Sequence, residues 1–237
     1  LAMLAAAAHW ISRDDHASGL WTAIGWAVMA SALVASQSRA GLAAALAAHL
    51  LLLALAVRGR WLDAGPAALG ALALATVAGL GALAAGLSGR LAELPDDLGH
   101  RLVIWQASLA AIAERPWTGH GLGAFPHLYE LYRLPAAEQP VASAHSLPLE
   151  WAAEAGVPGA VAVLAVWLSI AAALFSRVPR GSPAVLVALP ALAAMVLQGT
   201  VDPGPQVPGA AITAGLLIGL GLSRVRFTHP AAPAAGR

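Results

Sequence analysis

Long apolar stretches separated by short polar turns make up most of this chain. A helix needs about 20 apolar residues to cross the hydrocarbon core of a bilayer, and several stretches approach that length. The candidates are residues 20–37, 40–57, 65–88, 157–175, 184–199 and 207–222. The stretch 184–199 is the weakest, because it is short and contains Pro190. The pattern predicts an all-α fold, a polytopic transmembrane helical bundle of about six spans plus a partial N-terminal one.

Residues 89–156 interrupt this pattern with a long, more polar segment. Within it, residues 99–114 have the periodicity of an amphipathic helix that Pro116 ends. One face of that helix carries a mixed set of side chains: Arg101, Trp105, Ser108 and Ile112. A second short helix is expected over residues 147–155, with Gly156 at its end. We expect this segment to lie on the membrane as a lid of amphipathic helices.

These features divide the chain into four parts. Residues 1–88 hold the N-terminal transmembrane helices, 89–156 a periplasmic loop, 157–223 the C-terminal transmembrane helices and 224–237 a cytoplasmic tail. The apolar run at residues 1–11 is too short to span a bilayer and ends at a charged cluster. We interpret it as the end of a helix that begins earlier, which makes the chain a C-terminal portion of a longer protein.

The arginines indicate how the chain is oriented, because short cytoplasmic loops are enriched in basic residues. If the spans alternate, most of the arginines in short loops and at the chain ends fall on one side. These are Arg13, Arg58, Arg60, Arg177, Arg180, Arg224, Arg226 and Arg237. The long loop 89–156 then lies outside. In a bacterium this places it in the periplasm and the protein in the inner (plasma) membrane.

Composition supports a membrane protein and excludes several kinds of chemistry. The chain is 59% hydrophobic and 11% charged, against about 25% charged residues in soluble domains. It has no Cys and no Lys, which rules out disulfides, thiolate nucleophiles and a Walker A loop within this chain. Its net charge of +1 gives no indication of a nucleic-acid partner. It also lacks Asn, so we expect Ser, Asp or His where a relative uses Asn.

His145 stands out in "PVASAHSLPLEW", between two small residues and just before an apolar run. It could be a packing residue, a metal ligand or a catalytic base. His100, His120 and His127 share the same loop, so a metal site is conceivable. None of these histidines has the spacing of a metal-binding helix, and we therefore predict no metal site.

Two arginines on the outer side are candidates for binding phosphate. Arg39 lies between two apolar stretches and Arg101 lies on the amphipathic helix of the loop. A guanidinium binds phosphate through paired hydrogen bonds and keeps its charge at any relevant pH. The alternatives are a snorkelling arginine at a helix end for Arg39 and a solvated one for Arg101.

Two further patterns have ordinary explanations that we favour. The glycines at 119, 121 and 123 resemble a phosphate-binding loop, but no strand precedes them and no Lys follows, which favours a tight turn. Glu150 and Glu154 are four residues apart on one helical face. Paired carboxylates occur in glycosidases, but we interpret this pair as a solvated face.

Four segments together resemble the O-antigen ligase and Wzy-type O-antigen polymerase family. "RLVIWQASLAAIAERPWTGHGLGAF" (101–125) resembles its Arg-x-x-x-Trp … Pro-x-x-Gly-x-Gly-x-x-x-Phe signature, and "SAHSLPLEWAAEAGVPGA" (143–160) its Ala-His-Asn segment. "SRAG" (38–41) is similar to its Ser-Arg-Gly motif, and "VDPG" (201–204) to its Asp-bearing turn. Ser146 stands where the family usually has Asn, and Ala40 where it usually has Gly.

The resemblance implies a GT-C-like, metal-independent glycosyltransferase without a cofactor, surrounded by membrane lipids. Its donor would be a glycan on undecaprenyl pyrophosphate, and its acceptor a hydroxyl of lipid A-core or of a growing glycan. By the same resemblance Arg39 and Arg101 would bind the pyrophosphate and His145 would be the catalytic base. The quoted motifs also contain candidates for positioning the loop: Trp105, Gly119, Gly121 and Glu150.

Two other functions fit a polytopic chain. A polysaccharide or lipid transporter or flippase would need polar or broken helices at the bilayer midplane, whereas the charged residues here gather in the loop 89–156. A non-catalytic membrane subunit of a polysaccharide assembly machine is the other alternative.

The predicted orientation can be tested with reporter fusions. A fusion at residue 135 is expected to be active as a periplasmic reporter, and a fusion at residue 60 as a cytoplasmic one. The opposite pattern would place His145 on the cytoplasmic side and contradict the orientation.

Overall fold

The computed structural model of the chain describes residues 28–31, 33, 38–58, 94–133, 140–178 and 183–223. The regular structure in these residues is helical throughout. It consists of α3 (Arg39–Arg58), α5 (Leu94–Glu114), α6 (Phe125–Tyr132), α7 (Leu147–Phe175), α8 (Pro183–Gly199), the 3₁₀ helix η2 (Gly204–Gln206) and α9 (Pro208–Leu222). The predicted all-α class is therefore confirmed for the described part of the chain. The expected spans at 20–37 and 65–88, and the two chain ends, lie largely or wholly outside it.

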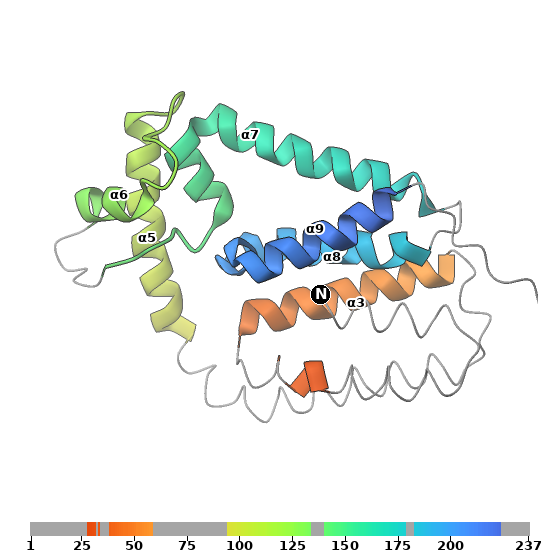
Figure 1. Cartoon of the computed structure of the whole chain (residues 1–237). Helices are drawn as coiled ribbons and strands as arrows, with labels where there is room; N and C mark the ends of the chain where they lie inside the picture. The colour runs from red at the N-terminus through yellow and green to blue at the C-terminus, as the bar shows by residue number, and fades with distance from the viewer. Residues whose placement is uncertain are drawn as a thin grey trace, which may run out of the picture.

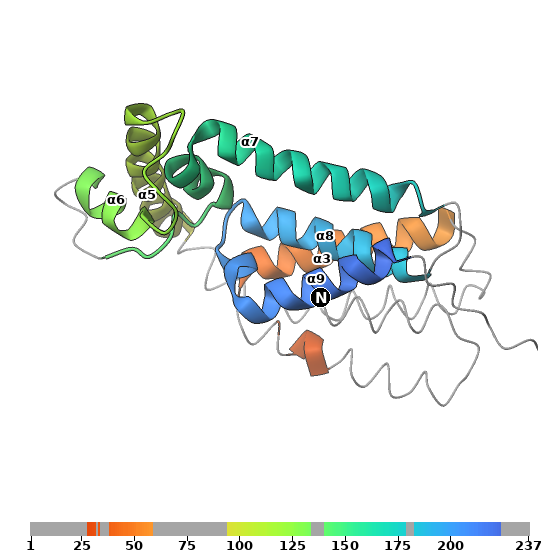
Figure 2. The same cartoon turned by 45° about the horizontal axis from the view of Figure 1, so that its top comes forward.

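Helices α3, α8 and α9 pack side by side, and α7 runs along the same bundle (Figures 1 and 2). Their shared core is apolar, and many of its members are alanines, which let the helix backbones approach closely. The fully buried alanines of this core are Ala48, Ala188 and Ala191. Leu52 and Val185, from α3 and α8, are also fully buried there.

Among the described residues, two helices are long and apolar enough to cross a membrane, Ala40–Arg58 and Leu147–Phe175, while α8 and α9 are shorter apolar helices. Helices thus form at four of the predicted spans. The count of six spans and the GT-C-like arrangement remain predictions. Along the second part of α7 the large side chains Val161, Leu164 and Leu168 are exposed, as expected for a helix surrounded by lipid.

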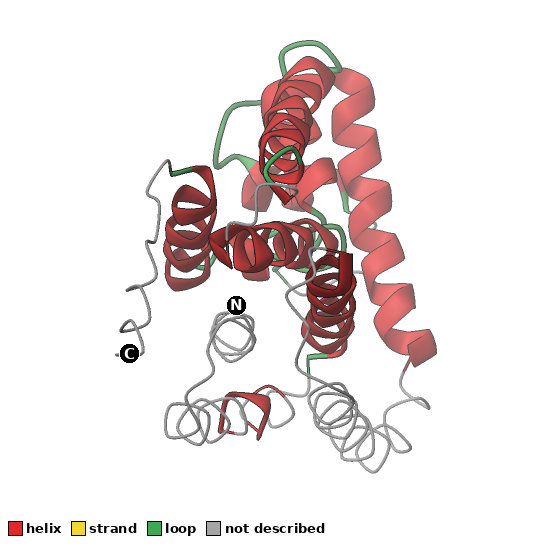
Figure 3. Cartoon of the chain, turned by 90° about the vertical axis from the view of Figure 1, so that its right-hand side faces the viewer, coloured by secondary structure: helices red, strands yellow, loops and turns green. Residues whose placement is uncertain are grey.

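A second layer, made of α5, α6 and the first part of α7, covers one end of the bundle (Figure 1). Seen along the bundle, α5 crosses at a large angle to the bundle helices (Figure 3). This layer has its own core, in which Ile104 of α5 and Phe125 and Tyr129 of α6 are almost completely buried. The crossing angle fits an amphipathic layer that lies parallel to a membrane surface.

The boundaries in this layer differ in two places from the sequence prediction. Helix α5 begins at Leu94, five residues before the predicted start at 99. Helix α6 was not predicted, because it is only eight residues long and its sequence begins with Phe125 and Pro126. Its formation depends on burying Phe125, Leu128 and Tyr129 against α5, which is a tertiary contact.

Helix α7 is two helices joined at a sharp break. Gly156 has a φ of 75° and a ψ of 167°, outside the helical region. The break separates the short helix at 147–155 from the long apolar helix at 157–175, as the sequence predicted. Pro158, two residues after Gly156, has no backbone N–H to donate in the first turn of the long helix.

Candidate functional site

The break in α7 leaves backbone groups without a hydrogen-bond partner in the helix. The turn at residues 116–121 forms hydrogen bonds with these groups. Pro158 has no N–H to donate to the carbonyl of Glu154, and Gly121 N donates to that carbonyl instead, at 2.9 Å. His120 N donates to the carbonyl of Ala153 at 3.0 Å, and Val157 N donates to the carbonyl of Pro116 at 2.8 Å. The turn therefore replaces the missing helical hydrogen bonds.

Glycine is required on both sides of this contact. A Cβ on Gly119 would lie 2.3 Å from the carbonyl oxygen of Glu154, and one on Gly156 would lie 2.6 Å from that of Trp117. Both glycines also have positive φ angles, 63° and 75°. The tight turn predicted for residues 119–123 is thus present, and its glycines allow close backbone packing between α5 and α7.

The loop before α7 is hydrogen-bonded to two helices at Ala144. Trp105 of α5 donates its indole N–H to the carbonyl of Ala144 at 3.1 Å. Glu150 of α7 accepts the N–H of Ala144 at 2.8 Å. The peptide groups on either side of Ala144 are therefore held by α5 and α7, and the next residue along the chain is His145.

His145 has a strained backbone and an unusual environment. It has a positive φ of 49° and is the one non-glycine residue with a positive φ among the described residues. Its Nδ1 atom is buried without a hydrogen-bond partner in the structure. A left-handed conformation costs on the order of 1–3 kcal/mol in a residue with a Cβ and is common at functional sites.

Arg101 joins α5 to a segment 100 residues away in the sequence. Its Nη1 atom donates to the carbonyl of Val201, in the turn between α8 and η2. The next residue, Asp202, accepts the N–H of Gly204 through Oδ1 at 2.7 Å. Three segments, namely α5, the loop before α7 and the turn at 200–204, therefore meet at one end of the bundle.

The surroundings of His145 favour its neutral form. Burial lowers the pKa of the imidazole below its usual value, and the positive charge of Arg101 lowers it further. The carboxylate of Asp202 acts in the opposite direction, and His100 adds a smaller lowering effect. A neutral imidazole at physiological pH can accept a proton.

Asp202 was missed as a functional candidate in the sequence. The only signal was the motif "VDPG", which carried part of the family resemblance but gave no role to its carboxylate. The electrostatic effect of Asp202 on His145 appears only when the turn at 200–204 is placed next to the loop before α7.

The interpretation of Glu150 and Glu154 as a solvated face is wrong. Both side chains are buried, with 8% exposure each. Glu154 accepts the N–H of Phe125, the first residue of α6, at 3.0 Å. Both carboxylates point inward because backbone N–H groups of the loops lack other partners there, and a buried carboxylate is stable only with such donors.

Arg39 is the first residue of α3, and its side chain lies outside the described part of the structure. The helix start is well defined, because Ser38 accepts the N–H of Gly41 through its hydroxyl oxygen at 3.0 Å. Figures 1 and 2 place the beginning of α3 at the same end of the bundle as the turn between α8 and α9. The proximity of Arg39 to the site remains a prediction.

The other histidines of the loop have separate environments. His120 interacts through Nε2 with the carbonyl of Ala111 at 2.9 Å, while His100 and His127 are exposed. Within the described residues, no group of three or more His, Asp or Glu side chains is placed to hold a metal ion.

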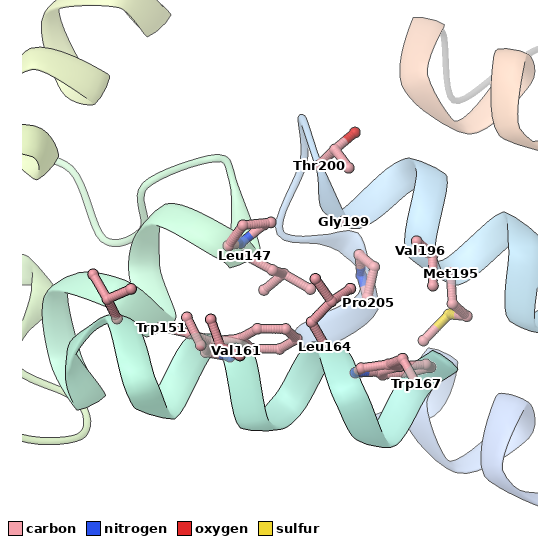
Figure 4. A pocket seen from close by; sticks show the side chains of 13 residues that line it. Leu147, Trp151, Val161, Leu164, Trp167, Met195, Val196, Gly199, Thr200 and Pro205 are labelled. Carbon is pink, nitrogen blue, oxygen red and sulfur yellow. The ribbon is translucent and has the colours of Figure 1, made fainter. Parts of the chain in front are cut away.

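An apolar cavity of about 240 Å³ lies between the long part of α7 and α8 (Figure 4). Side chains from α7 such as Trp151, Leu164 and Trp167 line it, facing Met195 of α8. At one end it reaches Leu147, Thr200 and Pro205. Leu147 lies two residues after His145 in the chain, and Thr200 lies two residues before Asp202. The sequence did not indicate the cavity, since it depends on how far α7 separates from α8.

Comparison with known proteins gives one family. A family model described as O-antigen ligase matches residues 24–164. The match covers more than half of the chain and includes α3, α5, α6 and the beginning of α7. None of the curated proteins compared with the chain matches it.

The contact between Gly119 and the break in α7 predicts a large effect on stability. Gly119→Ala is expected to lower the free energy of unfolding by roughly 2–4 kcal/mol, because the added Cβ is strained and collides with the backbone of α7. Thermal unfolding in detergent, followed by circular dichroism, measures the change. Gly99→Ala is the matched control, since nothing lies within 4 Å of its added Cβ. Equal unfolding midpoints for the two variants would contradict the prediction.

Proposed function

Because this chain belongs to the O-antigen ligase family, we propose that it is a membrane glycosyltransferase. It moves a glycan from an undecaprenyl-pyrophosphate carrier to an acceptor hydroxyl, on lipid A-core or on a growing glycan, at the outer face of the bacterial inner membrane. Family membership supports a transferase of the ligase or polymerase type. The observation that carries the mechanism is the meeting of Arg101, His145 and Asp202 at one end of the helix bundle.

Arg101 binds the leaving group in this mechanism. A guanidinium has five N–H donors. The Nη1 atom of Arg101 donates one hydrogen bond to the carbonyl of Val201, which leaves donors for the pyrophosphate. Negative charge grows on the pyrophosphate as the bond to the sugar breaks, and donors placed there stabilise the transition state. Arg39, at the start of α3, supplies a second guanidinium. No metal ion is needed for this step.

His145 acts as the general base. The neutral imidazole takes the proton of the acceptor hydroxyl while its oxygen attacks the anomeric carbon of the donor sugar. The bond between that carbon and the pyrophosphate oxygen breaks, and undecaprenyl pyrophosphate leaves with the electron pair. Asp202 stabilises the imidazolium that results, since its negative charge favours the protonated form.

The apolar cavity between α7 and α8 is suited to the first isoprene units of the carrier. Its lining is almost entirely apolar, and Leu147 and Thr200 lie at one end of it (Figure 4). These two residues are close in the chain to His145 and Asp202. The pyrophosphate would then lie at the bundle end near Arg101, with the lipid chain between the helices. Such a position keeps the charged head near water and the chain in the bilayer.

The distribution of arginines supports the site at the outer face. Arg58 ends α3, and Arg177 follows α7, where its guanidinium donates to the carbonyl of Gly221 at the end of α9, at 3.0 Å. Both lie at the bundle end opposite the site (Figure 1). This arrangement fits cytoplasmic Arg58 and Arg177 and a periplasmic site.

A transfer assay with a lipid-pyrophosphate-linked glycan tests the mechanism. His145→Ala is expected to lower kcat by on the order of 10²–10⁴-fold, which is the usual contribution of a general base. Arg101→Ala is expected to lower kcat by about 10²–10³-fold, through lost charge stabilisation. His127→Ala and Arg115→Ala are the matched controls, because both side chains are exposed. Wild-type rates for His145→Ala and Arg101→Ala in folded protein would disprove the mechanism.

The pH dependence of transfer provides a second test. As the pKa of His145 is lowered, the acid limb of kcat/KM is expected below about pH 6.5, the ordinary value for His. Asp202→Asn removes the negative charge that raises this pKa, so the limb should move to still lower pH. The variant keeps an oxygen that can accept the N–H of Gly204. Glu130→Gln, on the exposed side of α6, should leave the limb unchanged, and an upward shift in Asp202→Asn would contradict the assignment.

A further inference from the structure

The side chain of Glu150 bridges two segments of the site. Its Oε2 atom accepts the N–H of Ala144 at 2.8 Å. Its Oε1 atom accepts a hydrogen bond from the side-chain amide of Gln206, at 2.7 Å. Ala144 directly precedes His145, and Gln206 ends η2, four residues after Asp202. One buried carboxylate therefore connects the loop that carries His145 to the turn that carries Asp202.

The other side-chain hydrogen bonds of the site do not make this connection. Trp105 holds the carbonyl of Ala144 to α5, and Arg101 holds the carbonyl of Val201 to α5. Both contacts attach a segment to α5, and neither attaches the loop directly to η2. Glu150 and Gln206 therefore link the layer of α5, α6 and the first part of α7 to η2, just before α9.

The chemistry of this bridge indicates more than space filling. A buried carboxylate is costly unless donors surround it, and an apolar side chain of similar volume often stabilises a protein as well or better. Here both oxygens of Glu150 are used, each by a donor from a different segment. Such a geometry sets the relative position of the two segments.

We propose that Glu150 and Gln206 are a positioning pair that sets the distance between His145 and Asp202. This inference rests on the transferase function proposed above. Neither residue contacts the reacting atoms, and the pair acts through the peptide before His145 and through the turn of Asp202.

Loss of the pair has a defined consequence for the reaction. The loop stays beside Arg101, because Trp105 still holds Ala144, whereas the turn of Asp202 loses its hydrogen-bonded connection to the loop. Binding of the pyrophosphate to Arg101 is kept, so KM for the donor is unchanged. The imidazolium of His145 is then no longer stabilised by Asp202, so kcat falls. The expected decrease is on the order of 100-fold if Asp202 is displaced by about 1 Å.

A swap of the two side chains tests the pair in the intact protein, reconstituted in bilayers with a lipid-pyrophosphate-linked glycan. Gln206→Glu places two carboxylates against each other and should lower kcat with an unchanged donor KM. The double variant Glu150→Gln with Gln206→Glu restores a donor and an acceptor and should recover most of the rate. Gln106→Glu, an exposed position on α5, is the matched control.

The acid limb of the pH profile separates positioning from a loss of fold. The charged groups facing His145 are Arg101 and His100 from α5 and Asp202 from the turn. Gln206→Ala breaks the bridge without adding a charge, so Asp202 moves away and the limb should shift to lower pH. The double variant keeps the bridge and the net charge and should leave the limb where it is in the wild type. Unfolding midpoints identify variants that merely fail to fold, and Gln206 is exposed, so its substitution is compatible with folding.

The outcomes distinguish the two proposals. Wild-type kcat in Gln206→Glu, or a double variant as slow as that single variant, overturns the positioning pair while His145→Ala still lowers the rate. Normal activity of His145→Ala overturns the proposed function instead. A loss of rate in Gln206→Glu that the double variant reverses, with the matching pH shifts, supports the pair.

Discussion

The break in α7 between Gly156 and Pro158 is the constraint on which the rest of this site depends. A helix that breaks within a bundle leaves carbonyls without partners, and here the turn at 116–121 donates to those of Ala153 and Glu154. That contact attaches the end of α5 to the point where the long part of α7 begins. The direction of α5 across the bundle, and with it the position of Arg101, follows from this attachment.

Once α5 and α7 are joined, the loop before α7 has little freedom. Trp105 and Glu150 hold both polar backbone groups of Ala144, and His145 takes a left-handed conformation. The strain is stable because the neighbouring hydrogen bonds determine the path of the chain. Burial near Arg101 then favours the neutral imidazole, which is the form that the proposed base requires. Asp202 opposes that effect, and in the proposed mechanism it stabilises the imidazolium.

The burial of Glu150 and Glu154 could not be predicted from their spacing in the sequence. Two carboxylates four residues apart on an amphipathic helix are usually solvated, and nothing local distinguishes Glu150 and Glu154 from that case. Their role comes from donors far away in the sequence, at Phe125 and Gln206. A carboxylate that satisfies such donors stabilises the layer and orients it, where a solvated one would do neither.

Much of the fold followed from the sequence alone, because apolar runs, helical periodicity and Gly or Pro positions act locally. They determined α3 and the two parts of α7, the break at Gly156, the tight turn at 119–123 and the family. The site did not follow in the same way. Arg101 and Val201 are 100 residues apart, and the partnership of His145 with Asp202 and the apolar cavity beside α7 depend on how helices pack. Such contacts leave no periodic signal in the chain, because each is formed by one residue from each of two distant segments, and only the tertiary structure decided them.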